Sequence, residues 1–383
     1  MDFKSKLKDL ENAGLLRTIR DRGSPVTRVI TLGDREYINF SSNDYLGLAA
    51  NQEIVKAASE VMKELGFGAG ASRLLSGGTM LHQKLEESIA AFKTTESAVL
   101  LNSGYTANTG VIPALTNKET AIFSDELNHA SIIDGCRLSR AEVFIYRHTD
   151  MEHLRELLKT RKRAFNLIVT DTVFSMDGDI APLDELVKIA KEEGALLYID
   201  DAHGTGVLGQ GYGALRHFNL KPEDFIIQMG TLSKALGAFG AFVAATKEIT
   251  DWIINSARSL IYSTALPIPV VAASYKAMEI IKNSPSLVQR LWKRRSLAIR
   301  LFQELNLDTG RSQTPIIPVL LSSNQKALDL SGFLLERGIY APAIRRPTVT
   351  TPRIRITITA SHTEEDIQRL ADTLKEARQC GLL

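Results

Sequence analysis

The chain has 383 residues, of which 44% are hydrophobic and 23% charged, so it is long enough to form two domains with sizeable cores. Its 46 basic and 44 acidic residues leave a net charge of +2 without clusters of either sign, which gives no support for a nucleic-acid or membrane-surface partner. The two cysteines, Cys136 and Cys380, predict neither a disulfide framework nor a metal site, and no run resembles a signal peptide or a membrane span. We therefore expect a cytoplasmic protein without a bound metal.

The N-terminal residues have the pattern of a short amphipathic helix, and a series of apolar, β-branched runs follows. These runs are "SAVLLN" (97–102), "TAIFSD" (120–125), "EVFIYR" (142–147), "NLIVTD" (166–171), "ALLYID" (195–200), "FIIQMG" (225–230) and "AFVAAT" (241–246). Because they are apolar throughout rather than alternating, they are typical of strands covered on both faces. Helical patterns such as residues 182–194 lie between most of them, which predicts an α/β domain with a mostly parallel sheet.

The last two runs are joined by the stretch "TLSKALGAFG", which is short for the crossover that a parallel pair of strands needs. We therefore expect these two strands to be antiparallel, with Lys234 in the loop between them, facing inward at the edge of a buried sheet. A lysine in such an apolar setting has a lowered pKa and a nucleophilic amine. On this pattern alone, a chemical role and a structural role for Lys234 are equally compatible with the sequence.

The character of the chain changes after about residue 285. A strand pattern at 314–323 and a helix pattern at 324–338 precede "RIRITITA" (353–360), in which the isoleucines alternate strictly with other residues. A final helix begins with Thr363 as its cap. The sequence therefore predicts an N-terminal segment (1–45), a large α/β domain (46–285) and a small C-terminal α+β domain (286–383).

Polar residues occur where predicted strands end, and ligand sites of α/β sheets collect at the carboxyl ends of strands. Asp200 ends one strand with His203 shortly after it, Ser175 follows another, and a Ser-Gly-Tyr turn at 103–105 opens a helix. Each has a structural alternative, since an Asp closing a strand is commonly a turn or cap residue and a Gly-containing turn is commonly only a turn. The two histidines near these ends, His129 and His203, have the same alternative.

Taken together, a nucleophilic lysine, a carboxylate on a buried strand and a helix start that attracts anions are what pyridoxal phosphate requires. The amine would form the Schiff base, the carboxylate would keep the pyridine nitrogen protonated, and the helix start would hold the phosphate. Two Gly-rich stretches, 66–70 and 206–213, do not follow a predicted strand in a βαβ unit, so a dinucleotide fingerprint is not supported.

Seven motifs together closely resemble the α-oxoamine synthases, a branch of the fold-type-I (aspartate aminotransferase-like) pyridoxal-phosphate enzymes. They are "SNDYLGL", "GASRLLSG", "DELNHASIIDG", "FSMDGDIAPL", "DDAHGTGVLG", "GTLSKALG" and "YSTALP". The resemblance runs from about residue 17 to the C-terminus and implies a large domain with a mostly parallel seven-stranded sheet, a small C-terminal domain and a homodimer with active sites at the subunit interface. It also implies a C-acyltransferase that joins an amino acid to an acyl thioester with loss of carbon dioxide.

By resemblance, Lys234 is the Schiff-base lysine, Asp200 the partner of the pyridine nitrogen, and His129 the residue that stacks on the ring. Other cofactor contacts implied by the family are His203 at the ring oxygen, Ser175 near it, Gly104, Tyr105 and Thr231 near the phosphate, and Thr264 from the second subunit. The residues implied to meet substrate are Arg20 (with Arg17 as the alternative), Asn43, His129, Thr348 and Arg355.

The alternation in "RIRITITA" bears on this assignment, because Arg353 and Arg355 share the face opposite the isoleucines. Two like charges on one side of a strand usually indicate solvent, whereas a guanidinium is also the natural partner of a carboxylate. The resemblance favours Arg355 as the carboxylate ligand and leaves Arg353 unassigned. Two departures from the family are a shortened stretch after Thr348 and Thr172 in place of a common glycine.

Within the branch, "DDAHGTGVLG" and "AIRRPTV" are most similar to members that use L-alanine and a pimeloyl thioester in biotin biosynthesis. The sequence leaves open whether coenzyme A or acyl carrier protein carries the acyl group. The alternatives are a glycine-using 2-amino-3-ketobutyrate CoA ligase and a non-catalytic partner subunit, although such a subunit can lose the lysine that this chain retains as Lys234.

Overall fold

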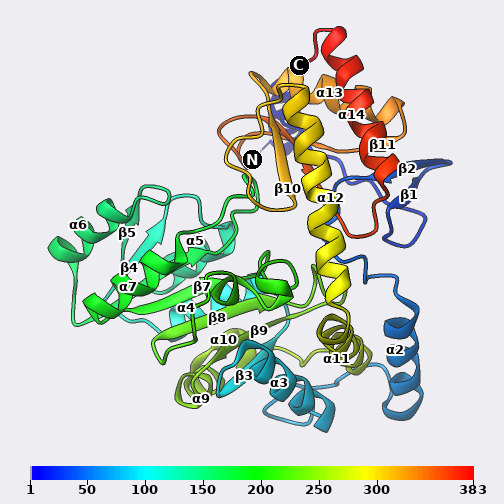
Figure 1. The fold of residues 1–383 in the computed structure, drawn as a ribbon. Coiled ribbons are helices and arrows are strands. Elements are labelled where there is room, and N and C mark those ends of the chain that lie inside the picture. The colour runs from blue at the N-terminus through cyan, green and yellow to red at the C-terminus, as the bar shows by residue number, and fades with distance from the viewer. Residues whose placement is uncertain (1) are drawn as a thin grey trace. The chain divides into compact units, whose positions relative to one another are not determined.

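The computed structural model describes residues 2–383, and their contacts form two compact units (Figure 1). The large unit comprises Leu48–Ser175 and Ile180–Val288. The small unit comprises the chain up to Gly47, the short segment Met176–Asp179 and Gln289–Leu383. The domain boundaries expected from the sequence (1–45, 46–285 and 286–383) remain a prediction.

The large unit is built on a seven-stranded sheet in the order β3-β9-β8-β7-β6-β4-β5. Its strands are β3 (Ser97–Leu101), β4 (Thr120–Asp125), β5 (Glu142–Tyr146), β6 (Phe165–Asp171), β7 (Leu196–Asp200), β8 (Ile226–Thr231) and β9 (Ala241–Ala245). The five strands from β8 to β5 pair in parallel, whereas β9 is antiparallel to both β8 and β3. The predicted antiparallel pair on either side of Lys234 is therefore confirmed, as is the mostly parallel seven-stranded sheet.

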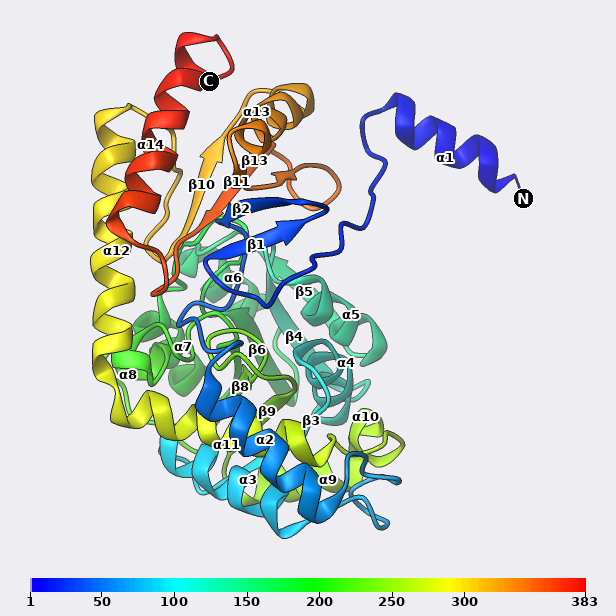
Figure 2. The same cartoon turned by 90° about the vertical axis from the view of Figure 1, so that its right-hand side faces the viewer.

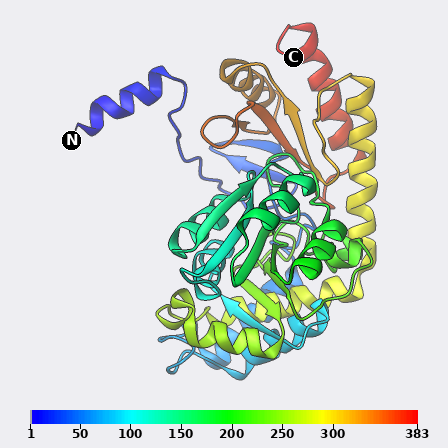
Figure 3. The same cartoon turned by 90° about the vertical axis from the view of Figure 1, so that its left-hand side faces the viewer.

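Helices cover both faces of this sheet, which explains why its strands are apolar throughout (Figure 3). The α-helices of this unit are α2 (Gln52–Leu65), α3 (Met80–Lys93), α4 (Gly104–Ala114), α5 (Ala130–Leu138), α6 (Met151–Arg161), α7 (Leu183–Glu193), α8 (Ala214–His217), α9 (Lys247–Ser256), α10 (Arg258–Ile261) and α11 (Ile268–Asn283). Helix α4 lies against β3, β8 and β9, and its residues Ala107 and Val111 belong to a core cluster with Val99 and Met229. This packing brings the first turn of α4 to the carboxyl ends of the central strands.

The small unit contains two three-stranded sheets and a helical layer. One sheet has the order β10-β13-β12 and the other β1-β2-β11. The elements are β1 (Val29–Leu32), β2 (Arg35–Asn39), β10 (Ile316–Leu320), β11 (Ile339–Tyr340), β12 (Ala343–Ile344), β13 (Arg353–Thr357), α1 (Phe3–Asn12), α13 (Asn324–Glu336) and α14 (Glu364–Gln379), while α12 (Pro285–Glu304) continues the chain from one unit into the other. Strand β2 pairs in parallel with β11, so residues 35–39 belong to the same unit as the C-terminal residues.

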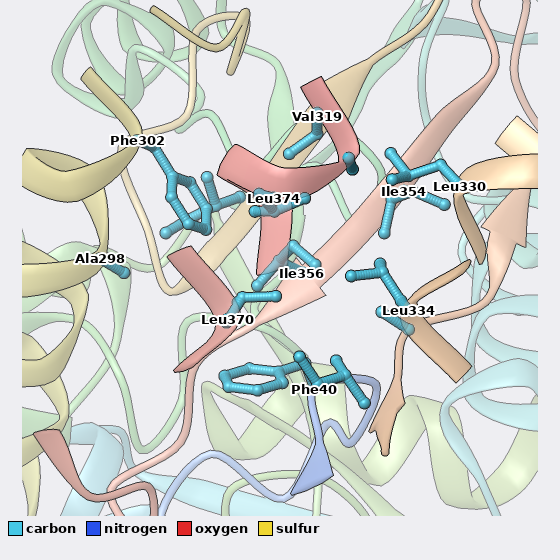
Figure 4. Close-up of a cluster of buried hydrophobic side chains, with 14 of the residues drawn as sticks. Phe40, Ala298, Phe302, Val319, Leu330, Leu334, Ile354, Ile356, Leu370 and Leu374 are labelled. Atoms are coloured by element: carbon cyan, nitrogen blue, oxygen red, sulfur yellow. The ribbon is translucent and has the colours of Figure 1, made fainter. Parts of the chain in front are cut away.

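The alternation in "RIRITITA" has the predicted consequence on one face of β13. Ile354 and Ile356 are fully buried in a core with Phe302 and Leu370 (Figure 4). The opposite face does not point to solvent, since Arg353 and Arg355 are also buried. The solvent exposure that the charge pattern alone indicates is therefore wrong, because both guanidinium groups have partners inside the small unit.

Helix α1 (Figure 2) differs from the other helices because none of its residues is buried. Asp2 caps it by accepting hydrogen bonds from the backbone N–H groups of Lys4 and Ser5. Within residues 2–383, no helix is long and apolar enough to cross a membrane.

Candidate active site

The carboxyl ends of β6 and β7 place two aspartates side by side. Asp171 and Asp200 are the last residues of these strands and are partners in the parallel register. Both are buried. Burial first, and then repulsion from Asp200, raise the pKa of Asp171 well above its ordinary value. The sequence analysis singled out Asp200 and missed Asp171, although "NLIVTD" ends in the same way as "ALLYID".

The carboxylate of Asp200 is held on both oxygens. Its Oδ2 accepts a hydrogen bond of 2.8 Å from Nδ2 of Asn108, and its Oδ1 accepts one of 2.9 Å from the backbone N–H of Ala202. Asn108 lies on α4 and is fully buried, with its own Oδ1 accepting from the hydroxyl of Tyr198 at 2.8 Å. Two hydrogen bonds, one on each oxygen, fix the direction of this carboxylate. Asn108 was missed from the sequence, where the only signal is one amide in an apolar helical stretch.

The same amide links Asp200 to His129. Nδ2 of Asn108 also donates to the hydroxyl of Ser131 at 2.8 Å, and that hydroxyl lies 2.7 Å from Nδ1 of His129. The backbone N–H of Ser131 points at the same ring nitrogen from 3.3 Å, so Nδ1 is an acceptor and the neutral ring carries its proton on Nε2. Burial, reinforced by the charge of Lys234, lowers the pKa of His129 although Asp200 opposes the shift. His129 is therefore neutral near pH 7.

Lys234 lies in the loop between β8 and β9, as the sequence predicts. Its charge lowers the pKa of both His129 and Asp171, which puts its amine in the electrostatic environment of this cluster. The loop is closed by a hydrogen bond of 2.8 Å from the N–H of Gly237 to the carbonyl of Lys234. Gly237 has φ +65°, and a Cβ there would lie 2.3 Å from the backbone nitrogen of Ala49, so only glycine fits.

The first turn of α4 offers the anion-binding feature that the sequence predicts. Ser103 is its cap, accepting from the N–H of Thr106, and Gly104 and Tyr105 follow in the turn where helix N–H groups lack intrahelical partners. Tyr105 lies edge-on to His129, with ring centroids 6.4 Å apart, and its hydroxyl contacts the carboxylate of Asp134. The helix start, the histidine and the Asp200 network therefore belong to one site.

The remaining predicted cofactor residues lie in the same unit. Thr231 ends β8, and its hydroxyl donates to the carbonyl of Gly240 at 2.9 Å, which ties the two ends of the Lys234 loop together. His203 is buried just after β7, and Ser175 is half-buried beyond β6. Thr264 forms a bridge with Ser72 and its carbonyl accepts from Asn102, so this chain's own contacts place it at a loop rather than in the Asp200 network.

Asn43 and Arg355 meet in the small unit although they are far apart in sequence. Nη2 of Arg355 donates to Oδ1 of Asn43 at 3.1 Å, and Nη1 donates to the hydroxyl of Thr357 at 2.8 Å. Burial raises the pKa of the nearby Tyr45 to about 12, against the opposing charge of Arg355. Arg353 instead pairs with Asp177 at 2.6 Å and with the carbonyl of Met176 at 3.0 Å, which accounts for its burial by structure alone.

Arg20 and Arg17 both line a cavity of about 410 Å³ in the small unit. Its walls are otherwise largely apolar or small, being formed by Leu16, Thr18, Leu328, Ser331, Gly332, Leu335, Tyr340, Pro342, Ala343 and Arg345. Nη2 of Arg17 donates to the hydroxyl of Thr348 at 3.2 Å. This bond joins Thr348, which the sequence analysis expects to contact substrate, to the N-terminal segment. Arg345 donates to the carbonyls of Gly14 and Leu16, which fixes that segment over the cavity wall.

The donor set of the large unit fits the cofactor that the sequence analysis expects. A primary amine, a doubly hydrogen-bonded carboxylate, a neutral imidazole and a helix start lie on neighbouring elements, and together they match an aldehyde, a ring nitrogen, a flat ring and a phosphate. No group of three or more His, Cys, Asp or Glu side chains that could hold a metal ion occurs in the described residues, 2–383.

The chain is similar to known proteins over most of its length. The family model of aminotransferase class I and II matches residues 35–374. A putative 8-amino-7-oxononanoate synthase from Thermodesulfovibrio yellowstonii is 55% identical over 97% of this chain and 96% of its own length. The chain belongs to the aminotransferase class I and II family. Within it, the 8-amino-7-oxononanoate synthase from Thermoanaerobacter pseudethanolicus is 46% identical over 96% of this chain and 94% of its own length.

Solved structures of the family share the fold. The serine palmitoyltransferase of Sphingomonas wittichii has a TM-score of 0.93 at 28% identity, covering 100% of this chain and 98% of its own. A structure described as SPT with a PLP internal aldimine matches equally well at 27% identity, with the same coverage. An 8-amino-7-oxononanoate synthase from Francisella tularensis has a TM-score of 0.79 at 29% identity, covering 91% of this chain and 99% of its own. The resemblance to the fold-type-I α-oxoamine synthases is thereby confirmed.

Proposed function

We propose that the chain is a pyridoxal-phosphate-dependent C-acyltransferase that condenses L-alanine with a pimeloyl thioester, releasing carbon dioxide and giving 8-amino-7-oxononanoate for biotin biosynthesis. Relatives at 44–55% identity over nearly the whole chain are named 8-amino-7-oxononanoate synthase or putative 8-amino-7-oxononanoate synthase. The observation that carries the proposal is the network in which Asn108 fixes Asp200 and, through Ser131, His129, with Lys234 in the same electrostatic environment.

When bound, the cofactor supplies an aldehyde that takes an amine and a ring that accepts electrons from the amino acid's α-carbon. Lys234 would hold the aldehyde, Asp200 would keep a proton on the ring nitrogen, and His129 would lie against the ring. The other proposed contacts are His203 and Ser175 at the ring oxygen, Gly104, Tyr105 and Thr231 near the phosphate, and Thr264 from the second subunit. The tight hydrogen bonding of Asp200 supports its role, since a carboxylate fixed as an anion stabilises a positive ring nitrogen.

The chain's own groups can move the proton that the reaction requires. The amine of Lys234, once free of the cofactor, is the proposed general base for the α-proton of alanine. His129 contributes a neutral ring with its Nε2–H available as a donor, because Ser131 occupies Nδ1. The neutral form matters, since a charged imidazolium beside the ring would oppose the positive charge that Asp200 is positioned to support.

Arg355 is the proposed ligand of the alanine carboxylate. A guanidinium offers two parallel N–H donors that match a carboxylate, and Asn43 and Thr357 orient it within the small unit. Thr348 is the proposed substrate contact next to Arg17. Its position beside the N-terminal segment is compatible with this role despite the shortened stretch that follows it.

The cavity lined by Arg17, Arg20 and Arg345 supports a dicarboxylic rather than a simple acyl group. No acidic residue is among the described residues that line it, so it offers positive charge beside apolar walls. A pimeloyl chain has a polymethylene body that matches the apolar walls and a terminal carboxylate that matches the positive charges. An acetyl group has neither of these two parts. The cavity therefore favours the pimeloyl substrate over the alternative, a 2-amino-3-ketobutyrate CoA ligase, which would use an acetyl group.

A substrate panel tests the proposal. We expect thiol release with L-alanine plus pimeloyl thioester, offered on coenzyme A and on acyl carrier protein, and little release with glycine plus acetyl-CoA. The reverse preference would identify the ligase. Lys234→Ala should take up the cofactor but lose roughly 10²–10⁴-fold in turnover. A Lys234→Ala protein with wild-type turnover would refute the mechanism, and a wild-type protein that takes up no cofactor would favour the non-catalytic partner subunit.

A homodimer is part of the proposal. Around Thr264 the large unit exposes Leu74, Leu75 and Tyr262, of which Leu75 is 80% exposed, and large apolar side chains grouped on a surface mark an interface. A self-association there would bring Thr264 toward a second copy. A cytoplasmic location also remains a proposal, supported by two free cysteines and the absence of a disulfide between them.

A further inference from the structure

A second aspartate follows Asp200 and faces a different environment. Asp201 is 1% exposed, and Lys93, at the end of α3, is 4% exposed. Nζ of Lys93 and Oδ2 of Asp201 are 2.7 Å apart, so the two side chains form an ion pair inside the large unit. Lysine is almost never fully buried without a partner, because removing its charge from water is costly.

All hydrogen-bonding positions of this pair are used. The Lys93 ammonium donates to Asp201, to the hydroxyl of Thr205 at 2.8 Å and to the carbonyl of Tyr212 at 3.0 Å, which satisfies its three N–H groups. Oδ1 of Asp201 accepts from the hydroxyl of Thr172 at 2.7 Å and from the N–H of Ala214 at 3.2 Å. Thr172, whose place in the family is commonly taken by glycine, thus has a defined partner.

The network fastens the turn that carries the catalytic groups. The carbonyl of Asp201 accepts from the N–H groups of Gly204 and Thr205, and the N–H of Thr172 donates to the carbonyl of Asp200 at 2.9 Å. Residues 200–205 are therefore anchored to α3, to the end of β6 and to the segment at 212–214. Asp200 and His203 lie within this turn, so their directions depend on where Asp201 is held.

We infer that Lys93 is a positioning residue: by pairing with Asp201 it fixes the turn that presents Asp200 and His203 to the cofactor. The inference rests on the proposed function. The pair also has an electrostatic effect, because Asp171 and Asp200 end two neighbouring strands and the buried Asp201 follows directly. The positive charge of Lys93 lies closest to Asp201, so it offsets the repulsion that this side chain would exert on its two neighbours.

The site is shaped for lysine. Gly213, with φ +109°, packs so closely that a Cβ there would lie 2.1 Å from Oδ2 of Asp201 and 2.5 Å from Nζ of Lys93. The larger guanidinium of arginine has no room beside it, so Lys93→Arg should not substitute for lysine. Lys93→Met keeps the length of the side chain without its charge.

The experiment compares Lys93→Met, Asp201→Asn and the double variant Lys93→Met/Asp201→Asn with the wild type at 20 °C. The readouts are the pyridoxal-phosphate dissociation constant, the visible circular dichroism of the bound cofactor, kcat and KM for alanine, and Tm. We expect Lys93→Met to weaken cofactor binding by about tenfold or more, to change the visible circular dichroism and to lower kcat rather than raise KM. The double variant should recover only part of the affinity and signal, because it removes the unpaired buried charge but still lacks the bond between residues 93 and 201 that holds the turn.

Two further variants keep the inference testable if Lys93→Met does not fold. Thr172→Val removes one hydrogen bond to Asp201 at nearly constant volume and should cause a smaller change of the same kind. Lys191→Met is the matched control, since it removes a lysine from an exposed ion pair with Glu223 in the same unit. It should behave as the wild type.

The outcomes separate the inference from the proposed function. A lowered Tm with unchanged circular dichroism, cofactor affinity and kcat in Lys93→Met and Thr172→Val would reduce the pair to a stabilising contact and overturn the inference. A wild-type protein that binds no cofactor or releases no thiol would instead refute the proposed function.

Discussion

Asn108 is the residue on which most of the site's geometry depends. Its amide nitrogen donates to both Asp200 and Ser131, and its oxygen accepts from Tyr198, so one fully buried side chain sets three others. Buried polar networks of this kind are stable only when every member is satisfied. Removing one member leaves the others as buried polar groups without a hydrogen-bond partner, which is energetically unfavourable.

Asn108→Ala should therefore weaken cofactor binding. It leaves Oδ2 of Asp200 and the hydroxyl of Tyr198 without this partner, at about 1–3 kcal/mol for each buried group, so we expect the affinity for pyridoxal phosphate to fall by about tenfold or more. Titration of the apo-protein with the cofactor, followed by visible absorption, measures the change. Thr109→Ala on the same helix is the control, and equal affinities of the two variants would contradict the network.

Arg20 and Arg17 give a second prediction at the scale of single residues. Both line the same cavity, but the guanidinium of Arg17 also donates to Thr348, so Arg20 is the better candidate for binding a substrate carboxylate. We expect Arg20→Ala to raise KM for the pimeloyl thioester by about 10–100-fold, as for loss of a hydrogen bond to a charged group. Arg17→Ala is the comparison, and a larger effect there would transfer the role to Arg17.

At the scale of elements, β13 and α14 hold the small unit together. The two isoleucines of β13 and Leu370 of α14 meet in the core shown in Figure 4, while α14 is capped by Thr363 and Asp366 in a reciprocal box. The amphipathic pattern of the sequence predicts this packing. The burial of both arginines on the other face of β13 follows only from their partners in the fold.

Leu370→Ala should lower the free energy of unfolding of the small unit by about 2–5 kcal/mol, because it opens a cavity in a fully buried cluster. Urea unfolding followed by circular dichroism measures the loss. Leu7→Ala, on a helix with no buried residue, should change it by less than about 0.5 kcal/mol. A similar loss in both variants would show that the cluster is not the source of the stability.

His362 links β2 to the start of α14 and makes the stability depend on pH. Its ring stacks on Phe40, its Nε2 bonds the carbonyl of Asn39, and burial lowers its pKa from 6.5 to about 4. Below pH 6.5 the unfolded chain therefore binds a proton at this residue that the folded chain does not, so stability falls as the pH drops toward 4.

At pH 5 this residue alone should have removed about 2 kcal/mol relative to pH 7. Replacing it in His362→Gln takes away this part of the pH dependence, whatever the variant's absolute stability. Urea midpoints of both proteins at pH 7 and pH 5 provide the measurement. Equal pH dependence in the two proteins would show that His362 titrates normally.

At the scale of the whole molecule, the exposed apolar side chains beside Thr264 predict self-association. Leu74, Leu75 and Tyr262 are each more than half exposed, an arrangement that water disfavours unless a second surface covers it. We expect sedimentation at twice the 42.2 kDa of one chain.

Leu75→Asp should weaken this dimer by about tenfold or more, since it would bury an unpaired carboxylate. Cofactor affinity should fall with it if Thr264 acts across the interface. Ile145→Asp, at another exposed position of the same unit, is the control. A monomeric wild type with full activity would contradict both the interface and the role of Thr264.

The sequence by itself determined where the seven strands of the large sheet lie along the chain, the antiparallel β8–β9 pair and the position of Lys234, because periodicity and loop length act locally along the chain. Its motifs also indicated the family before any contact was known. The tertiary structure alone decided that Asn108 holds Asp200, that Arg353 pairs with Asp177 while Arg355 meets Asn43, and that Lys93 lies buried against Asp201. These pairings join residues that are distant in the chain, and a side chain's charge has no preferred partner until the fold brings one within reach.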